Sequence, residues 1–171
     1  MRAKKNSFTD VLKPIIYWDA SYAIACLVDT EQYHSECVAF RKRLQKVGVL
    51  SVVSDFVYDE LSFFLVRQAL AKEGRKTGQH WIDVKKSKPD FITEIMPSVL
   101  EKTSELNDMT LWLPTSENVK EKAFQLMTDY SLLPTDAFHI AAAKQEGVLS
   151  FATLDSDFLR VDDIIVYTCL P

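Results

Sequence analysis

A chain of 171 residues, 47% hydrophobic and 26% charged, has the size and composition of one soluble globular domain. Only four glycines and six prolines occur, which argues against a long linker or a repeat array. No apolar run approaches the roughly 20 residues of a membrane-spanning helix, so no membrane association is expected. The three cysteines form no C-x-x-C pair, which disfavours structural zinc and a disulfide framework and favours a cytoplasmic location.

The net charge of −4 is unevenly divided. Residues 1–88 hold fifteen Lys and Arg against ten Asp and Glu, whereas residues 89–171 hold five against fourteen. The basic residues gather near 41–46, 72–76 and 85–88. Such runs are either solvated helix faces or a surface that follows nucleic-acid phosphates, and both interpretations stay open.

The first elements surround an early acid. Residues 1–14 are polar and are interpreted as an N-terminal extension, either a flexible arm or an added edge strand. The β-branched and aromatic residues 15–18 predict a strand that ends at Asp19. Ser21 is a candidate cap for a helix that runs to Val28.

A second helix is predicted over 34–47, where the apolar spacing is helical and a glycine follows. Residues 49–53 predict a strand, and Ser54 is a plausible N-cap of the next helix. The apolar stripe of that helix leaves Glu60 beside it.

The middle of the chain is polar. Residues 72–88 are expected to form an exposed connection, and a helical stretch over 89–105 should be kinked or divided by Pro97. Residues 72–108 are therefore interpreted as a longer helical insertion within a single domain, residues 15–171.

A third strand is predicted over 110–113, followed by a cap at Thr115 or Ser116 and an amphipathic helix over 119–127. Residues 164–167 supply a last strand. Strands that alternate with helices predict an α/β fold, a three-layer α/β/α sandwich around a mainly parallel sheet.

The stretch 133–158 carries most of the functional information. Pro134 and Thr135 are helix-start signals, Gly147 is a helix stop, and the apolar run 148–153 predicts a buried strand.

Acidic residues occupy comparable places along this pattern. Asp19 follows the first strand and Glu60 lies in a helix after the second. Asp136 opens a helix, and Asp155 and Asp157 follow a late strand. Each alone could be a turn or cap residue. Together they are expected at the carboxyl ends of the strands, where open α/β sheets bind ligands. Because carboxylates repel, such a cluster calls for a cation, and Mg²⁺ prefers oxygen ligands.

At these positions the chain resembles the PIN-domain family of metal-dependent ribonucleases, which includes VapC-type toxins. The resemblance lies in residues 17–21, 59–61, 135–143 and 153–158, whose order and spacing span residues 15–167. It implies hydrolysis of RNA phosphodiester bonds by an endoribonuclease with bound Mg²⁺ or Mn²⁺. The residues that it implies as acidic ligands are Asp19, Glu60, Asp136 and Asp155, with Asp157 as a fifth acid and Ser21 and Thr153 as polar supports.

The resemblance also implies partners. Toxins of this kind are commonly homodimers held inactive by an antitoxin whose segment enters the acidic pocket. The extra lengths of 1–14 and 72–108 depart from compact toxins and leave a stand-alone role open. RNA is the expected substrate, although the sequence does not specify which RNA.

The sequence also bears on functions other than metal-dependent hydrolysis. His139 lies on the helix face of Asp136 and is either catalytic or, more commonly for such a position, a packed and hydrogen-bonded residue. Absence of a P-loop or a G-x-G-x-x-G motif disfavours nucleotide cofactors. The main alternative is a non-catalytic PIN-like module for RNA binding or assembly.

Overall fold

The computed structural model describes residues 2–171, and its sheet is entirely parallel. The strands lie in the order β1-β6-β5-β2-β3-β4. Their bounds are Lys4–Asn6 (β1), Ile15–Trp18 (β2), Leu50–Val53 (β3), Leu111–Trp112 (β4), Ser150–Ala152 (β5) and Ile165–Tyr167 (β6). The expected α/β class and mainly parallel sheet are confirmed.

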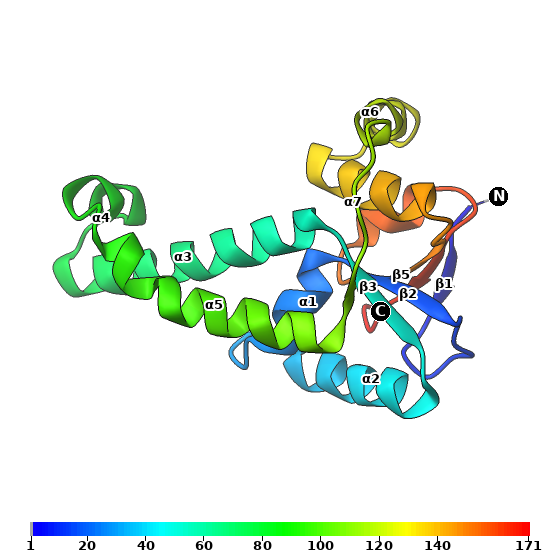
Figure 1. Ribbon diagram of the computed structural model, residues 1–171, viewed down its shortest axis with the longest axis horizontal. Coiled ribbons are helices and arrows are strands. Elements are labelled where there is room, and N and C mark those ends of the chain that lie inside the picture. The colour runs from blue at the N-terminus through cyan, green and yellow to red at the C-terminus, as the bar shows by residue number, and fades with distance from the viewer. Residues whose placement is uncertain (1) are drawn as a thin grey trace.

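Helices cover both faces of this sheet and also extend away from it (Figure 1). Helices α6 and α7 pack together on one side, and α1 and α2 on the other. The bounds are Ala20–Leu27 (α1), His34–Val47 (α2), Asp55–Thr77 (α3), Trp81–Ser87 (α4), Phe91–Met109 (α5), Val119–Tyr130 (α6), Pro134–Gln145 (α7) and a short 3₁₀ helix, Ser156–Arg160 (η1). Within residues 2–171, none of these helices is long and apolar enough to cross a bilayer.

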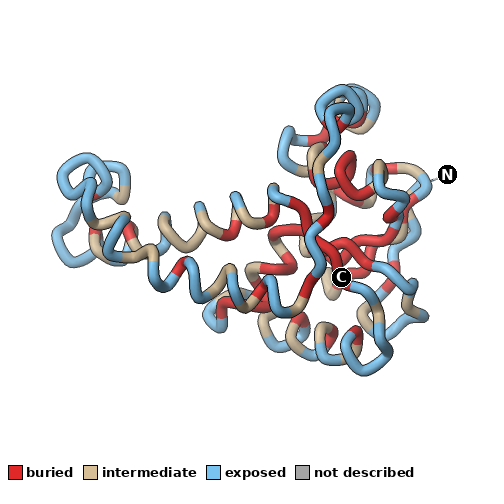
Figure 2. The backbone as a smooth tube through the Cα atoms, viewed as in Figure 1, coloured by how far each residue is buried: buried red, intermediate tan, exposed pale blue. Residues whose placement is uncertain are grey.

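The central strands explain why the core sits where it does. The last three residues of β2 and all three of β5 are buried, as strands of a sheet covered on both faces should be. Tyr17 pairs with Phe151 and Trp18 with Ala152, so β2 and β5 end side by side. Figure 2 shows this buried centre in red, surrounded by exposed loops and helix ends.

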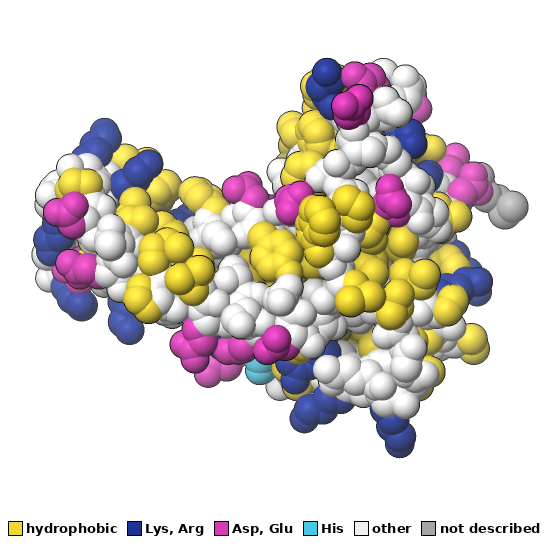
Figure 3. All heavy atoms as spheres, viewed as in Figure 1, with side chains coloured by type: hydrophobic (Ala, Val, Ile, Leu, Met, Phe, Trp, Pro, Cys, Tyr) yellow, Lys and Arg dark blue, Asp and Glu magenta, His cyan; other side chains and the backbone are white. Residues whose placement is uncertain are grey.

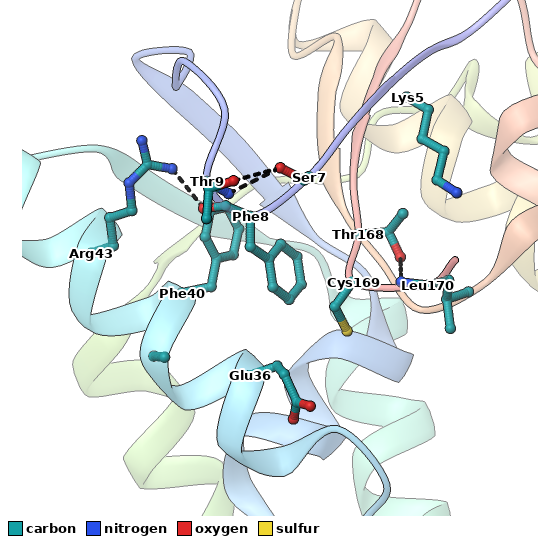
Figure 4. Close-up of a pocket in the computed structure, with 11 residues that line it drawn as sticks. Lys5, Ser7, Phe8, Thr9, Glu36, Phe40, Arg43, Thr168, Cys169 and Leu170 are labelled. Atoms are coloured by element: carbon teal, nitrogen blue, oxygen red, sulfur yellow. Dashed lines mark hydrogen bonds between the residues drawn. The ribbon is translucent and has the colours of Figure 1, made fainter.

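The N-terminal extension adds an edge strand to the sheet. Lys4 is in register with Ile165, and Met1 lies outside the described residues. Beyond β1 the ring of Phe8 stacks on Phe40 at a centroid distance of 4.1 Å. The backbone oxygen of Phe8 accepts a hydrogen bond from the Arg43 guanidinium at 2.6 Å. These contacts wall an apolar hollow of about 630 Å³ between the N-terminal segment, α2 and the C-terminal residues (Figure 4). The extension is thus packed on the domain rather than loose.

Residues 72–88, expected as an exposed connection, are largely exposed as predicted, but they are helical rather than a simple connection. Helix α3 continues to Thr77, and α4 follows after Gly78, whose φ of 70° ends α3 in the left-handed region. Lys, Arg, Glu and Ala are good helix formers, so the polar composition that suggested a loop is equally compatible with an exposed helix. We call residues 63–100 the arm, because α3 and α5 run side by side away from the sheet to α4 at its tip (Figure 1). That 72–108 is an insertion stays a prediction.

Three local expectations also need correction. Of the two effects expected of Pro97, division of the helix is wrong, because α5 is a single helix with this proline in its second turn, and the kink stays a prediction. Ser21 is the second residue of α1, and the N-cap is Asp19, whose carboxylate accepts the Ser21 amide. Helix α6 is preceded by Asn118 at the N-cap position, and neither Thr115 nor Ser116 takes that place.

Gly74 allows α4 to fold back against α3. A Cβ atom at this position would lie 2.4 Å from the backbone oxygen of Gln79 and 3.3 Å from a methyl group of Val84. Backbone oxygen cannot rotate away as a side chain can. The close approach of the two helices therefore depends on a residue without a Cβ atom.

We expect Gly74→Ala to lower the melting temperature of the protein. In an unobstructed helix interior the same change stabilises by about 1 kcal/mol, so the contact with Gln79 should reverse the sign. Thermal unfolding followed by circular dichroism measures the effect. Ala71→Gly in the same helix is the control for propensity and should cost about 1 kcal/mol. A higher melting temperature for Gly74→Ala would contradict the close packing of α4.

Candidate metal and nuclease site

Asp19 is the most buried acid at the carboxyl end of the sheet, with 4% of its surface exposed. It follows β2 and caps α1, which fixes its backbone. Its Oδ2 atom accepts hydrogen bonds from the Ser21 hydroxyl at 2.6 Å, the Thr153 hydroxyl at 2.9 Å and the Ser21 amide at 3.3 Å. These donors compensate the burial of its charge. Ser21 and Thr153 are therefore polar supports of Asp19, as the resemblance implied.

The loop after β5 is joined to the same carboxylate. The Leu154 amide donates to the Ser21 hydroxyl, and the Asp155 amide donates to the Thr153 hydroxyl, each at 2.9 Å. Asp155 then caps η1, because its Oδ1 atom accepts the Asp157 amide at 2.8 Å. Side-chain hydroxyls thus hold the ends of β2 and β5 in one arrangement.

Asp136 reaches this group from another element. It lies in the first turn of α7, which starts at Pro134. Burial, together with the charges of Asp155, Asp19 and Asp157 and against an opposing contribution from His139, raises the pKa of Asp136 to about 7. The three acids predicted after β2 and β5 are therefore close enough to Asp136 to disfavour its ionised form. Residues distant in sequence meet at one end of the sheet.

Glu60 joins the site through a histidine. Its Oε1 atom lies 2.6 Å from His139 Nε2, and His139 Nδ1 lies 2.8 Å from the Tyr17 hydroxyl. The Tyr17 hydroxyl is in turn 2.6 Å from the Ser54 hydroxyl. Burial disfavours the imidazolium, but the hydrogen bond to Glu60 and the charge of Asp19 outweigh it and raise the pKa of His139.

The hydrogen-bonded series from Glu60 through His139 to Tyr17 was not predicted from the sequence. The role predicted for Ser54, at its end, needs correction. His139 is fully buried and hydrogen-bonded, which agrees with the packed role expected for it. Ser54 occupies the N-cap position of α3 as predicted, but its hydroxyl bonds Tyr17 instead of capping the helix. A buried tyrosine needs a partner for its hydroxyl, and that requirement was the available signal at Tyr17.

Other side chains next to the site belong to the core. Trp18 and Tyr22 are buried and meet edge to face at a centroid distance of 5.0 Å, so neither offers a ring to a nucleobase. Cys26 is buried beside Cys37.

The donor set suits a hard divalent cation, although the ligand roles of the five acids stay a prediction. Among residues 2–171, no three His, Cys, Asp or Glu side chains already surround a common point. Mg²⁺ needs only one or two direct carboxylates and completes its shell with water and phosphate oxygens. The mutual repulsion expressed in the pKa of Asp136 is what a cation would relieve. Asp157 adds less to the negative potential of the site than the other acids do, because the Arg160 guanidinium pairs with its carboxylate at 2.9 Å.

We expect Asp136→Asn to stabilise the metal-free protein at pH 8 and to have little effect at about pH 3. The pKa of Asp136 is raised from 3.8 to about 7, so the stability contributed by its protonated form is fully present below pH 3.8, is lost as pH rises through 7 and stays lost above it. Thermal melts in EDTA across this range measure the difference. Asp59→Asn, at an exposed position on α3, is the matched control and should show no such trend. A loss of stability at pH 8 would contradict the electrostatic interpretation.

Comparison with known proteins agrees with this geometry. Residues 16–164 match the family PIN domain. Ribonuclease VapC6 of Methanocaldococcus jannaschii is 25% identical over 149 residues, which cover 87% of this chain and 94% of that protein. The crystal structure of VapBC2 from Rickettsia felis, bound to a DNA fragment from their promoter, matches with a TM-score of 0.57 at 13% identity. The match covers 90% of this chain and 98% of the other and shows a shared fold. Because the family match spans most of its length, the chain belongs to the PIN domain family.

Proposed function

We propose that this protein is a ribonuclease that hydrolyses RNA phosphodiester bonds with a bound Mg²⁺ or Mn²⁺. The observation that carries the proposal is the gathering of Asp19, Asp136, Asp155 and Asp157 from three parts of the chain, where burial and then the charges of the neighbouring acids raise the pKa of Asp136 to about 7. Membership of the PIN domain family and the relative named Ribonuclease VapC6 support the same activity. Cleavage within an RNA, by an endoribonuclease, is the form that we propose.

Each acid has a proposed task. Asp19, Asp136 and Asp155 would hold the cation, and Asp157 and Glu60 would complete the site through water or through direct contact. When bound, the cation supplies Lewis-acid stabilisation of the negative charge that develops on a phosphodiester. Ser21 and Thr153 orient Asp19 by donating to one of its oxygens, which leaves Oδ1 facing His139 at 3.6 Å. His139 orients Glu60 in the same way.

A second candidate function rests on a different observation. Glu60 is engaged with His139, and among the described residues no three ligating side chains converge as they stand. A PIN-like module that binds RNA or assembles with a partner without hydrolysis would tolerate this arrangement. The two functions differ in whether added metal produces cleavage.

We expect purified protein to cleave RNA with Mn²⁺ or Mg²⁺ and to lose all activity in EDTA. Asp19→Asn and Asp155→Asn should each abolish cleavage and flatten the rise in melting temperature with added Mn²⁺, since ligand binding stabilises the folded state by RT ln(1 + [L]/Kd). Gel analysis of single-stranded and structured RNA, paired with thermal melts, measures both effects. Asp59→Asn is the control and should behave as the unmodified protein.

Three results would decide against hydrolysis by metal. Cleavage that persists in EDTA would exclude the cation. If the melting temperatures of both variants rise with Mn²⁺ as in the unmodified protein, Asp19 and Asp155 are not metal ligands and serve only as cap and turn residues. Metal binding and RNA binding without cleavage would establish the non-catalytic module.

We propose further that the protein is the toxin of a toxin–antitoxin pair. The structural relative from Rickettsia felis is a VapBC2 complex, which supports an antitoxin partner.

A homodimer is proposed as well, because Trp112 and Phe124 each expose more than half of their surface. Phe124 continues inward through Phe138 to Phe56, at centroid distances of 6.2 and 5.2 Å. Exposed aromatic surface of this kind is typical of protein contacts.

We expect the tagged protein, recovered from its native cells, to elute as a complex with a second, smaller protein. A basic segment of that partner would neutralise the acidic site, so ribonuclease activity should appear only after the partner is removed. Size-exclusion chromatography with mass spectrometry identifies the components. Phe124→Glu should disrupt a homodimer, whereas Lys122→Glu on the same helix should not. Recovery as a free, active monomer would contradict the toxin proposal.

A further inference from the structure

The tip of the arm stands over the same face of α3 that carries Glu60. Residues 60, 67 and 74 are spaced by seven, which is about two helical turns, so they share one stripe along the helix. Gly74 in this stripe contacts α4 through Gln79 and Val84. At 1.5 Å per residue, α4 therefore crosses α3 about 21 Å from Glu60 and on the same side.

Aromatic contacts give the orientation of α4. Trp81 meets the ring of Phe63 edge to face at a centroid distance of 6.2 Å, and Phe63 lies nearer to Glu60 than Gly74 does. The Trp81 face of α4 is therefore directed along α3 toward the acidic site. Lys85 lies one turn after Trp81 and shares that face. Phe63 keeps 56% of its surface exposed between the two regions.

This path carries positive charge that the protein does not neutralise. Arg67, Lys85 and Lys86 are exposed, and within residues 2–171 none of them forms an ion pair. The nearby acid Glu73 is already engaged by Lys76 at 2.7 Å and Lys88 at 2.8 Å. Figure 3 shows Lys and Arg side chains around the tip of the arm and a wide hollow between the tip and the lobe of α6.

We propose that the arm is the RNA-positioning surface of this protein. One RNA strand runs along the exposed stripe of α3, with phosphates on Lys85, Lys86 and Arg67 and the cut made at the acidic site. The acids repel phosphate, so affinity for RNA must come from cations elsewhere. The proposal rests on the proposed function for the place of cleavage.

Binding can be tested without cleavage. The affinity of a fluorescein-labelled 20-nucleotide RNA is measured by anisotropy in EDTA at several salt concentrations, so the result does not depend on nuclease activity. We expect Lys85→Ala with Lys86→Ala to reduce the slope of log affinity against log salt by about 1.4, because a single strand contributes about 0.7 per phosphate contact. At 0.1 M salt this corresponds to about a fivefold loss per lysine. Arg67→Ala should reduce the slope by about 0.7.

Lys42→Ala with Lys46→Ala is the matched control. It removes the same charge from exposed positions one turn apart on α2, away from the arm. The control should keep its affinity and its slope. Equal losses in the two double variants would show general charge attraction and overturn the proposal, as would a normal slope for Arg67→Ala. Failure of the unmodified protein to cut RNA would instead reject the proposed function and leave the binding result standing.

Discussion

A buried carboxylate sets the arrangement of the whole site. Asp19 is almost completely removed from water, and an ionised group in that position is tolerated only because hydrogen-bond donors replace its hydration. Ser21 supplies two of those donors from α1, and Thr153 supplies one from the end of β5. The same three groups that stabilise the charge therefore bind two central strands and a helix together. Loss of either hydroxyl would remove a donor to Asp19 and leave the amide of Leu154 or of Asp155 without its acceptor, at a cost of about 1–3 kcal/mol.

Several acidic side chains lie together at the site, and their mutual repulsion does not stabilise the fold. Asp136, Asp155 and Asp157 lie within electrostatic range of one another and of Asp19, and the raised pKa of Asp136 shows that this proximity opposes ionisation. The apolar centre of the sheet offsets the repulsion, because β2 and β5 bury their side chains on both faces next to the site. The buried strands therefore hold in place a cluster of acids that by itself destabilises the fold, as is common at ligand-binding sites.

Local signals made much of the fold predictable. Strand β2 has the bounds that its β-branched and aromatic residues indicate, and Pro134 opens α7 where a fixed φ is favourable. The arm was missed in part, because Lys- and Glu-rich sequence fits both a loop and an exposed helix. Its close crossing depends on Gly74, whose contacts with Gln79 and Val84 follow from the way the chain turns after Gly78, which no local pattern specifies.

The acidic set could be expected because each acid follows or opens an element at the same end of a parallel sheet. The hydrogen bonds that connect the side chains within the site could not be predicted in this way. The hydrogen bond between Tyr17 and His139 joins residues that only the folded sheet brings together, and the hydroxyl of Ser54 has two competing uses that the sequence cannot rank. The pKa of Asp136 likewise depends on distances and burial that no local pattern contains.

The parallel pairing of the first and last strands has a consequence for biosynthesis. Residue 17 pairs with residue 151, and residue 4 with residue 165, so the sheet closes only when residues up to 167 are available. Contacts this distant in sequence form late and slowly. On the ribosome, the N-terminal half can collapse around α1, α2 and α3, but Asp155 and Thr153 are not yet present. The nascent chain therefore lacks a complete acidic site until residues 153–157 have emerged from the ribosome.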